Sequence, residues 1–380
     1  MDIRVLAVID TFRIGGPGKQ LIAFCKSAPE YGLAIRIASF LRRPNQTSPF
    51  IEACRTEGLP VRIFEERFPF DPRLPSLVRS ELIKNRADLL QTHSYKANVI
   101  GALLSSRMQR DGIRWAAYLH GTTQENLKVR MYYEMELLAV RRADGIVPVS
   151  EMIGRTVAGR LGRSRAHLEV IPNALLPETT SDGGIREQAR REMGAPDGAV
   201  VIGVIGRLSR EKGQDIFVDA LARLKDTKVF AVLVGEGPDE AALRARVEQL
   251  GLGDRVRFMG YQNDMAPIYA GMDLAVIPSL SEGIPNVALE AMGRRIPLIA
   301  TAVGGLPEMV ADGMSGLLVP PGDAEALAKS VRFLTDRPEE RQRMGEAGRA
   351  AIESRFSMAE RMKRVRALYE RLMTPRVSHG

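Results

Sequence analysis

The sequence is poor in the residues that mark several classes of protein. Its 380 residues include two cysteines, Cys25 and Cys54, so neither a disulfide framework nor a cysteine-based metal cluster is expected. No apolar run approaches the roughly 20 residues of a membrane span, and the start, MDIRVLAVID, lacks the basic and apolar regions of a signal peptide. These absences predict a cytoplasmic protein.

Several motifs of catalytic sites are also missing. The chain contains no G-x-G-x-x-G, which disfavours an NAD-dependent Rossmann enzyme, and no P-loop, H-E-x-x-H or G-x-S-x-G. It contains no Asp-x-Asp, so no carboxylate pair is evident that would hold a divalent ion on a diphosphate. We therefore predict a site without a metal and without a cofactor.

The net charge of +8 is unevenly distributed. Residues 1–173 carry 26 Lys and Arg against 17 Asp and Glu, and the remainder carries 28 against 29. The excess in the first half is explained by solubility or by an anionic partner, such as a phospholipid surface or a pyrophosphate-bearing acceptor. Nucleic acid is not expected, because no zinc-finger spacing, aromatic-interleaved basic stripe or basic tail is present.

Strand-like and helix-like segments alternate along the chain, which predicts α/β architecture with parallel sheets. Expected strands of the first half are Ile3–Ile9, Ala34–Phe40, Val61–Phe64, Leu89–Thr92, Trp115–Leu119, Ile146–Val149 and Leu168–Ile171. After a stretch that contains Pro, Gly, Thr and Ser, the alternation restarts with Ala199–Ile205, Val229–Val234, Val256–Phe258, Leu274–Pro278, Ile296–Ala300 and Leu317–Val319. The sequence therefore predicts two doubly wound domains, 1–173 and 199–355, a linker at 174–198 and a C-terminal helix within 356–380.

The stretch from Asp273 to Gly305 reads as strand, loop, helix and strand. Its polar loop, Ser279–Gly283, carries Glu282, and Pro285 suits a first helical turn because its missing N–H would be unpaired there. The unpaired amides at the helix start, near Ile284–Val287, predict an anion site.

Two carboxylates flank this predicted anion site. Glu282 precedes the helix, while Asn286 and Glu290 are four residues apart and share one helix face. A ligand with phosphate in the middle and hydroxyl-rich groups at both ends fits this arrangement. A nucleotide sugar has that shape.

Other glycine-containing turns follow predicted strands. Arg207 and Lys212 lie between Gly206 and Gly213, where a fork-like and a point-like cation suit phosphate oxygens, although solvated surface cations would look the same. The run from Gly15 to Gly18 precedes a helix and permits close backbone approach to phosphate or sugar, and it is equally typical of a tight turn. A third turn, Gly260 with Tyr261, presents backbone groups and a ring edge to a nucleobase.

The chain has four histidines. His93 and His120 both fall just after predicted strands of the first half, where open α/β sheets bind ligands. His120 is followed by Gly121, which leaves room for a ligand, so we predict a functional role for it; for His93 structural and functional roles remain open. We expect His167 and His379 to be structural.

Taken together, these residues resemble the retaining, metal-independent glycosyltransferases of the large family four, which have the GT-B fold. The motifs that carry the resemblance are GRLSREKG, VGEGPDE, SEGIPNVALEAM and TAVGGLPEMVADGMSGLLVPPGD in the second half, with GGPG, HG, VPVSE and VIPNA in the first. Glu282 and Glu290 match the two glutamates that this family separates by seven residues.

The resemblance implies a role for each of these residues. Glu290 would accept hydrogen bonds from the donor's ribose, Arg207 and Lys212 would hold the diphosphate, and Glu282 with the following amides would meet the sugar and its phosphate. Gly15 and Gly16 would close over the donor, and His120 would face the transferred sugar. The implied donor-binding set is Gly15, Gly16, Arg207, Lys212, Gly260, Tyr261, Glu282, Gly283, Ile284, Pro285, Asn286 and Glu290, and the implied catalytic set is His120, Glu282, Arg207 and Lys212.

The function that follows is retaining transfer of a hexosyl or N-acetylhexosaminyl group from a UDP- or GDP-sugar to a glycan or lipid-linked acceptor, in cell-envelope or exopolysaccharide synthesis. The segment Asn126–Arg142 mixes basic and apolar residues, which suits either a core helix with a solvated basic face or peripheral contact with an anionic membrane at its cytoplasmic face. The alternatives are a GT-B-type sugar-nucleotide epimerase and a non-catalytic nucleotide-sugar-binding protein.

Overall fold

The computed structural model describes residues 2–12, 14–42, 47–69, 71–121, 127–162, 166–175 and 185–374, without the side chains of residues 127 and 128. The chain divides into two compact units, Met1–Leu176 with Met358–Gly380, and Pro177–Ser357. Of the segments singled out above, Asn126, residues 176–184 of the predicted linker and His379 lie outside the described residues.

Unit 1 is built on a parallel sheet with the strand order β3-β2-β1-β4-β5-β6-β7. Its strands are β1 Ile3–Ile9, β2 Leu33–Arg42, β3 Val61–Glu66, β4 Leu89–His93, β5 Arg114–Leu119, β6 Gly145–Pro148 and β7 His167–Leu168. Most of these strands are nearly continuous apolar runs, as expected for strands that are buried on both faces.

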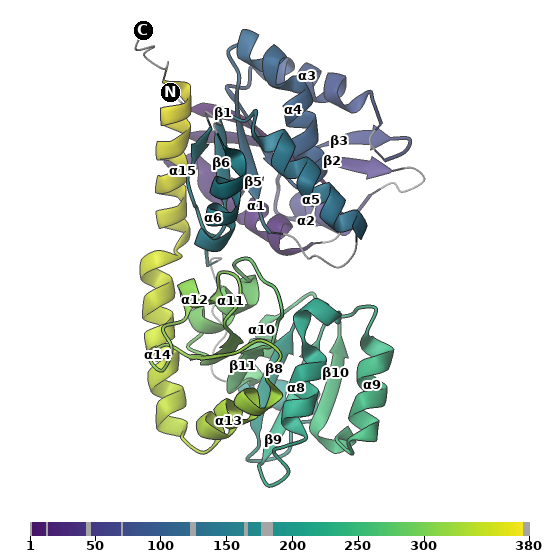
Figure 1. The fold of residues 1–380 in the computed structure, drawn as a ribbon, viewed down its shortest axis with the longest axis vertical. Coiled ribbons are helices and arrows are strands. Elements are labelled where there is room, and N and C mark those ends of the chain that lie inside the picture. Colours follow the sequence, from purple (N-terminus) through teal and green to yellow (C-terminus); the bar gives the residue numbers. More distant parts are fainter. Residues whose placement is uncertain are drawn as a thin grey trace. The chain divides into compact units, whose positions relative to one another are not determined.

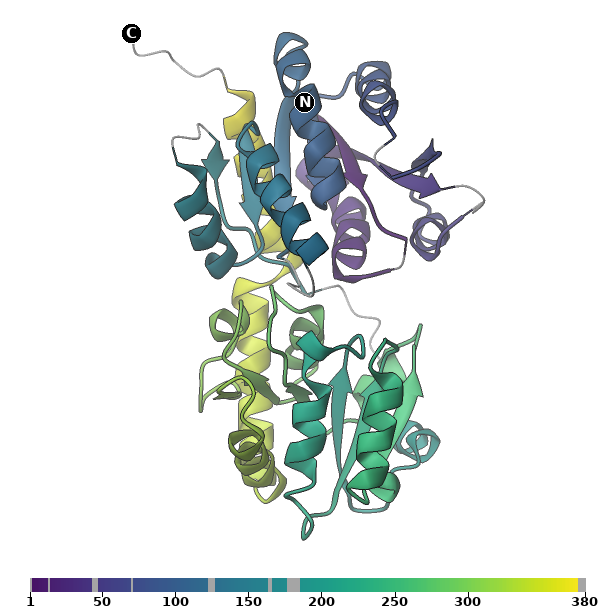
Figure 2. The same ribbon diagram turned by 45° about the vertical axis from the view of Figure 1, so that its right-hand side comes forward.

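Helices cover both faces of this sheet (Figures 1 and 2). They are α1 Gly16–Ser27, α2 Pro49–Thr56, α3 Leu74–Lys84, α4 Tyr95–Arg110, α5 Leu127–Val140, α6 Glu151–Leu161 and α15 Met358–Met373. Alternate residues of β1 belong to two separate cores: Leu6 and Val8 join the one that contains residues of α3 to α6, while Val5 and Ala7 join the one that contains residues of α1, α2 and α15.

Apart from shifts of one or two residues at the ends of several strands, two of the expected elements differ from the structure. The strand expected at Leu168–Ile171 is reduced to β7, which pairs only with β6 at the sheet edge; the Glu169 and Ile171 amides still donate to β6 carbonyls, so the segment continues as a looser connection. The helix expected at Phe356–Met373 begins at Met358, because a preceding helix, α14 Pro338–Arg355, ends just before it.

Unit 2 repeats the architecture with the strand order β10-β9-β8-β11-β12-β13. Its strands are β8 Val200–Ile205, β9 Val229–Val234, β10 Val256–Gly260, β11 Leu274–Ile277, β12 Leu298–Thr301 and β13 Leu317–Val319. Its helices are α7 Ile185–Met193, α8 Gln214–Leu221, α9 Glu240–Gln249, α10 Ala266–Gly271, α11 Asn286–Gly293, α12 Leu306–Met309, α13 Ala324–Thr335 and α14.

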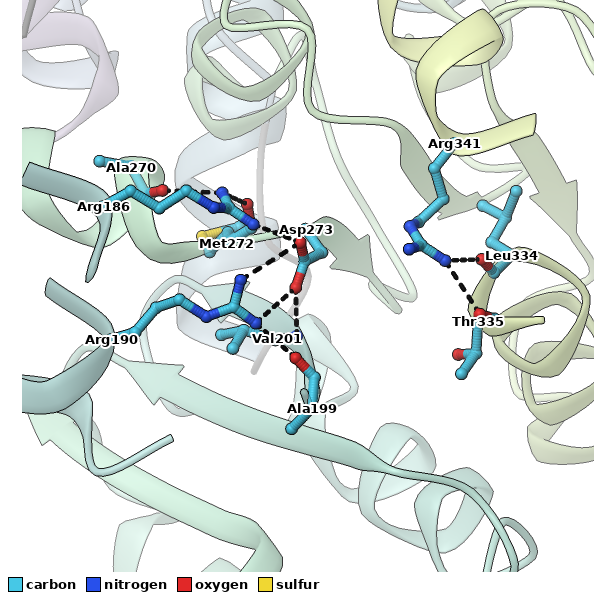
Figure 3. A network of polar contacts seen from close by, with 10 residues as sticks. All are labelled: Arg186, Arg190, Ala199, Val201, Ala270, Met272, Asp273, Leu334, Thr335 and Arg341. Atoms are coloured by element: carbon cyan, nitrogen blue, oxygen red, sulfur yellow. Dashed lines mark hydrogen bonds and ion pairs between the residues drawn. The ribbon is translucent and has the colours of Figure 1, made fainter. Parts of the chain in front are cut away.

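Asp273 ties α7 to this unit (Figure 3). Its carboxylate pairs with the guanidinium groups of Arg186 and Arg190 from α7, and its Oδ2 accepts a 2.7 Å hydrogen bond from the Val201 amide at the start of β8. Because Asp273 and Val201 stand at the amino ends of their strands, this network lies at the edge of the sheet opposite to the one where α/β sheets bind ligands. Asp273, the first residue of the stretch Asp273–Gly305, therefore has a structural role.

Each sheet has one topological switch point, where strand order reverses. It lies between β1 and β4 in unit 1 and between β8 and β11 in unit 2. Ligands of open α/β sheets bind outside the carboxyl ends of strands at such points. The loops that follow these four strands are therefore the candidate ligand-binding loops.

Candidate active site

In unit 2 the two loops at the switch point meet through a charged pair. Lys212 ends a short 3₁₀ helix, Arg210–Lys212, in the loop after β8, and its Nζ donates to Glu282 Oε1 of the loop after β11 at 2.7 Å. The Ser279 hydroxyl donates to the same oxygen at 2.7 Å. The Glu282 side chain is largely buried and that of Lys212 is about one-quarter exposed, so the ammonium is held firmly and stays accessible.

Glycines allow these loops to pack backbone against backbone. Gly304 adopts φ +59°, and a Cβ at this position would lie 1.9 Å from the Glu282 carbonyl oxygen. A Cβ on Gly213, at φ +65°, would lie 2.1 Å from the carbonyl oxygen of Pro278. Both positions combine the left-handed backbone that favours glycine with a contact that excludes any side chain. These two glycines fix the backbone on which Lys212 and Glu282 stand.

The helix behind the pair, α11, begins one residue later than expected. Pro285 has φ −74° and ψ 129°, so it is the N-cap and does not belong to the first turn. The N-cap residue makes no side-chain capping bond, and the Ala288 amide donates back to the Pro285 carbonyl. Ile284 is buried, and its Cδ1 lies against Gly305. The carbonyl oxygen of Gly283 accepts a 2.8 Å hydrogen bond from the Gly305 amide. The helix start thus keeps the positive end of its dipole beside Glu282.

Glu290 has a different environment from Glu282. It lies one turn after Asn286 on α11, and its Oε2 accepts a 2.8 Å hydrogen bond from the hydroxyl of Tyr269 on α10. Burial, and then the negative charge of Glu290, raise the pKa of Tyr269 well above its usual range, so the phenol remains a donor. Arg294 covers the Tyr269 ring, with its guanidinium carbon 4.6 Å from the ring centroid.

The remaining candidates of unit 2 lie on turns of the same carboxyl edge. The Arg207 side chain is exposed, and its carbonyl accepts from the Gln214 amide group at 2.9 Å. Gly260 ends β10 with φ +64°, and the next residue, Tyr261, is half exposed. The structure brings Lys212 and Glu282 into contact and leaves Arg207 and Tyr261 open to solvent.

In unit 1 a cavity of about 250 Å³ opens at the carboxyl ends of β1, β4 and β5. Its walls include Asp10, Pro17, His93, His120 and Gly121. Pro17 belongs to the first turn of α1, of which Gly15 is the N-cap and Gly16 the first residue. His120 therefore faces a cavity beside the glycine-rich turn, whereas Gly15 and Gly16 supply its neighbouring backbone.

The two histidines at this edge, His93 and His120, are joined by a hydrogen bond. His93 Nδ1 lies 2.9 Å from His120 Nε2, and His93 Nε2 lies 2.7 Å from the side-chain nitrogen of Gln91. Burial lowers the pKa of His120 to about 3, with a further contribution from Arg361, and lowers that of His93 well below its usual range. Both rings are consequently neutral at pH 7.

A cluster of buried charged residues includes Asp10 of the cavity wall. The ammonium of Lys96 lies 2.5 Å from Glu66 Oε2 and 3.4 Å from Asp10 Oδ2, and Glu66 and Lys96 are almost fully buried. Burial raises the pKa of Asp10, an effect that Lys96 opposes. Next to it, Ser94 adopts φ +79°, and its hydroxyl accepts from the Asp10 amide at 3.3 Å. A non-glycine residue in this region signals backbone strain, which is common at functional sites.

Aromatic and acidic side chains also line the cavity. The rings of Tyr95 and Tyr132 stack at 4.6 Å with 7° between their planes, and both residues line the cavity. Glu136 accepts a 2.6 Å hydrogen bond from Asn98, and burial raises its pKa to about 7. The cavity thus combines aromatic surface with hydrogen-bonding groups, as ligand pockets commonly do.

The sequence did not single out this second set of residues. Asp10, Ser94 and Tyr95 follow directly on strands that border the switch point, which is the signal that could have identified them. Glu66 and Lys96 carried no such signal, because their pairing joins positions thirty residues apart.

Two parallel-sheet, Rossmann-like units with candidate ligand-binding loops at their switch points are the fold of the GT-B class of glycosyltransferases. Residues 185–351 match the family model described as "Glycosyl transferases group 1", and residues 14–178 match the one described as "Glycosyltransferase Family 4". The chain belongs to the family 4 glycosyltransferases.

Two relatives and a solved structure agree with this assignment. The chain is 33% identical to a D-inositol 3-phosphate glycosyltransferase of Corynebacterium kroppenstedtii, over 95% of this chain and 83% of the relative. It is 32% identical to a 2-deoxystreptamine glucosyltransferase of Streptomyces kanamyceticus, over 68% and 69% of the two chains. Anabaena HepE in complex with UDP-glucose superposes with a TM-score of 0.83 at 23% identity, covering 97% of this chain and 100% of HepE, which supports the fold. In the part of the chain that the structure describes, every helix is too short or too polar to cross a membrane.

Proposed function

We propose that this glycosyltransferase moves a hexosyl or N-acetylhexosaminyl group from a nucleotide-diphosphate sugar to a hydroxylated acceptor, with retention and without a metal ion. The observation that carries the proposal is the Lys212–Glu282 pair at the unit 2 switch point, beside the start of α11. It combines a cation and a helix N-terminus for phosphate with a carboxylate for sugar hydroxyls.

The donor would lie along this edge of the sheet with its ribose at one end and its sugar at the other. Lys212 and Arg207 would hold the diphosphate, and Glu290 on α11 would accept from the ribose. Glu282 and the amides from Gly283 onward would meet the sugar. We expect UDP in preference to GDP, because HepE, which shares the fold, is solved with UDP-glucose.

The proposed reaction exchanges one C–O bond for another and moves one proton. The acceptor oxygen bonds to the anomeric carbon on the face from which the leaving group departs, the bond from that carbon to the diphosphate oxygen breaks, and the acceptor proton passes to the leaving diphosphate. Negative charge on the leaving group is stabilised by Lys212 and by the helix dipole. A cation–phosphate contact at 4 Å contributes roughly 1 kcal/mol in water and about 4 kcal/mol at an effective dielectric constant of 20, so exclusion of water is part of the mechanism.

The acceptor would enter the unit 1 cavity, where Tyr95 and Tyr132 offer a stacking face and Asp10 a carboxylate. A glycan or lipid-linked acceptor of cell-envelope or exopolysaccharide synthesis fits these groups. This part of the proposal is tested with acceptor sugars added to the donor assay, and Tyr132→Ala is expected to raise the acceptor KM without changing donor binding.

Contact with an anionic membrane at its cytoplasmic face is proposed for α5. Met131, Met135 and Leu138 are exposed at intervals of four and three residues, which places them on one helix face, and the exposed Arg141 and Arg142 follow. We expect weak binding to anionic vesicles that falls with added salt. Met131→Ser with Leu138→Ser should abolish it, and no binding of the wild type at low ionic strength would contradict it.

The function is tested with a panel of UDP-, GDP- and ADP-sugars, scored for thermal stabilisation, hydrolysis and transfer. Lys212→Ala should abolish most turnover, and Arg210→Ala, which removes an exposed cation from the same turn, is the control. Unchanged transfer by Lys212→Ala would refute the site. Release of an epimerised sugar nucleotide would instead identify an epimerase, and stabilisation without any turnover would identify a binding protein.

A further inference from the structure

A line of buried polar side chains runs through unit 1 from the C-terminal helix to the cavity. It begins at Tyr369 on α15, whose hydroxyl lies 3.0 Å from that of Tyr118 on β5. Tyr369 donates to Gln91 Oε1 at 2.7 Å, Gln91 contacts His93 at 2.7 Å, and His93 contacts His120 at 2.9 Å. All but His120, which lines the cavity, are almost completely buried.

The donors along this line can be assigned from the first bond onward. Because the Tyr369 hydroxyl donates to the Gln91 oxygen, the Gln91 amide nitrogen faces His93 Nε2. An amide nitrogen only donates, so His93 Nε2 accepts, and the neutral His93 ring carries its proton on Nδ1. His93 Nδ1–H then donates to His120 Nε2, and His120 must carry its own proton on Nδ1.

The remaining nitrogen of His120 has no bond of its own. Among the described residues, His120 Nδ1 is a buried atom without a hydrogen-bond partner. A buried N–H left without an acceptor is unfavourable, and a ligand oxygen that accepts from it removes that cost on binding. An uncharged N–H suits a hydroxyl or ring oxygen, whereas it gives no charge with which to hold phosphate.

We propose that Tyr369, Gln91 and His93 are positioning residues that hold His120 in the Nδ1–H tautomer, so that it donates a hydrogen bond to a sugar oxygen in the cavity. The sugar as ligand rests on the proposed function, while the tautomer rests on unit 1 alone. The C-terminal helix thereby contributes to the site through Tyr369. Tyr369 does not touch the ligand, because Gln91, His93 and His120 lie between them.

The tautomer can be measured directly in the full-length protein without any substrate. Long-range proton–nitrogen correlation spectra of ¹⁵N-histidine-labelled protein distinguish Nδ1–H from Nε2–H, and with only four histidines each ring is assigned from its own substitution. We expect both His93 and His120 to be protonated on Nδ1 at pH 7. A wild-type His120 protonated on Nε2 would overturn the proposal.

A matched pair of hydroxyl deletions separates the relay from packing. Tyr369→Phe removes the donor that orients Gln91, so His93 and His120 should become tautomer mixtures. Tyr118→Phe deletes a buried hydroxyl one step beyond Tyr369 and should leave both rings on Nδ1–H. A purely structural role predicts that neither variant changes the tautomer, and that outcome overturns the relay.

Gln91→Met provides a second perturbation with a similar side-chain length. It removes the amide that fixes His93, and His120 should again populate both tautomers. If one-half to one-tenth of the molecules keep the Nδ1–H form, the apparent affinity for the sugar falls about two- to tenfold. The loss should appear in the KM for the acceptor, which the proposed function places in this cavity, and Tyr118→Phe should show none of it.

The two kinds of failure give different results. Tautomer mixing in Gln91→Met with an unaltered KM would overturn the assignment of His120 to a sugar oxygen while supporting the relay. Absence of transfer from every nucleotide sugar would count against the proposed function, and the tautomer spectra would still decide the relay.

Discussion

His120 and Glu136 line one cavity, and burial gives them opposite effects on stability as pH changes. Burial lowers the pKa of His120 from 6.5 to about 3, so between these values the unfolded chain binds a proton that the folded chain does not. Its contribution to stability is complete above pH 6.5 and is lost as pH falls. At 1.36 kcal/mol per pKa unit, acidification from pH 7 to pH 5 removes about 2 kcal/mol.

Glu136 works in the other direction. Burial raises its pKa from 4.5 to about 7, so the folded chain binds the additional proton in this range. Its contribution is complete below pH 4.5 and is lost as pH rises through 7. Acidification from pH 7 to pH 5 therefore adds about 2 kcal/mol. Because the two effects nearly cancel in the wild type, only single substitutions reveal them.

The assay uses the one tryptophan of the chain. Trp115 is buried in β5 of unit 1, so its fluorescence follows the unfolding of that unit in urea. Between pH 7 and pH 5, the stability of the wild type relative to His120→Gln should fall by about 2 kcal/mol, and relative to Glu136→Gln it should rise by about 2 kcal/mol. His167→Gln, at an exposed position in β7, controls for the substitution itself. Differences that stay flat with pH for both variants would show that neither group is buried as described, and would refute the reasoning.

Three further outcomes concern unit 2. Lys212→Ala should lower kcat/KM for transfer by about 10²-fold or more, as the loss of one preorganised electrostatic group does, while Arg210→Ala changes it by less than about twofold. Asp273→Ala leaves two guanidinium groups without their carboxylate and should destabilise unit 2 by about 2 kcal/mol in calorimetry. This is less than the roughly 3–5 kcal/mol lost with a fully buried pair, because the arginines are partly exposed. A melting temperature equal to that of the wild type would contradict this prediction. Gly304→Ala forces a Cβ against the Glu282 carbonyl and should weaken binding of UDP, GDP or ADP at least about tenfold in isothermal titration, whereas unchanged binding would show that the loop adapts.

Strand positions could be predicted from the sequence where burial on both faces made the apolar run continuous. Ile3–Ile9 and Val229–Val234 coincide with β1 and β9 for this reason. The prediction was weaker at β7, because an edge strand with one partner needs only a short apolar run. The beginning of α11 was placed one residue early, since proline fits both the N-cap and the first turn of a helix.

The site was predictable only as far as single loops. The sequence placed Lys212 and Glu282 at the ends of two strands, yet their contact joins loops 70 residues apart and depends on β8 and β11 being neighbours. The same holds for His93 and His120, whose bond requires β4 beside β5. A motif gives the chemistry of one loop, and the strand order decides which loops meet.

The contacts of Glu282 and Glu290 separate two carboxylates that the sequence presents as a pair. A general acid and base would have to face the same reacting bond. Instead, Glu282 holds an ammonium and a serine hydroxyl, while Glu290 accepts from a buried tyrosine. An ammonium has three protons to donate, and the bond to Glu282 uses one, which leaves Lys212 able to bind phosphate oxygens without giving up its partner. In the proposed site, Glu282 would therefore orient the cation before the donor arrives and Glu290 would not, which is the arrangement expected for two ends of one extended ligand.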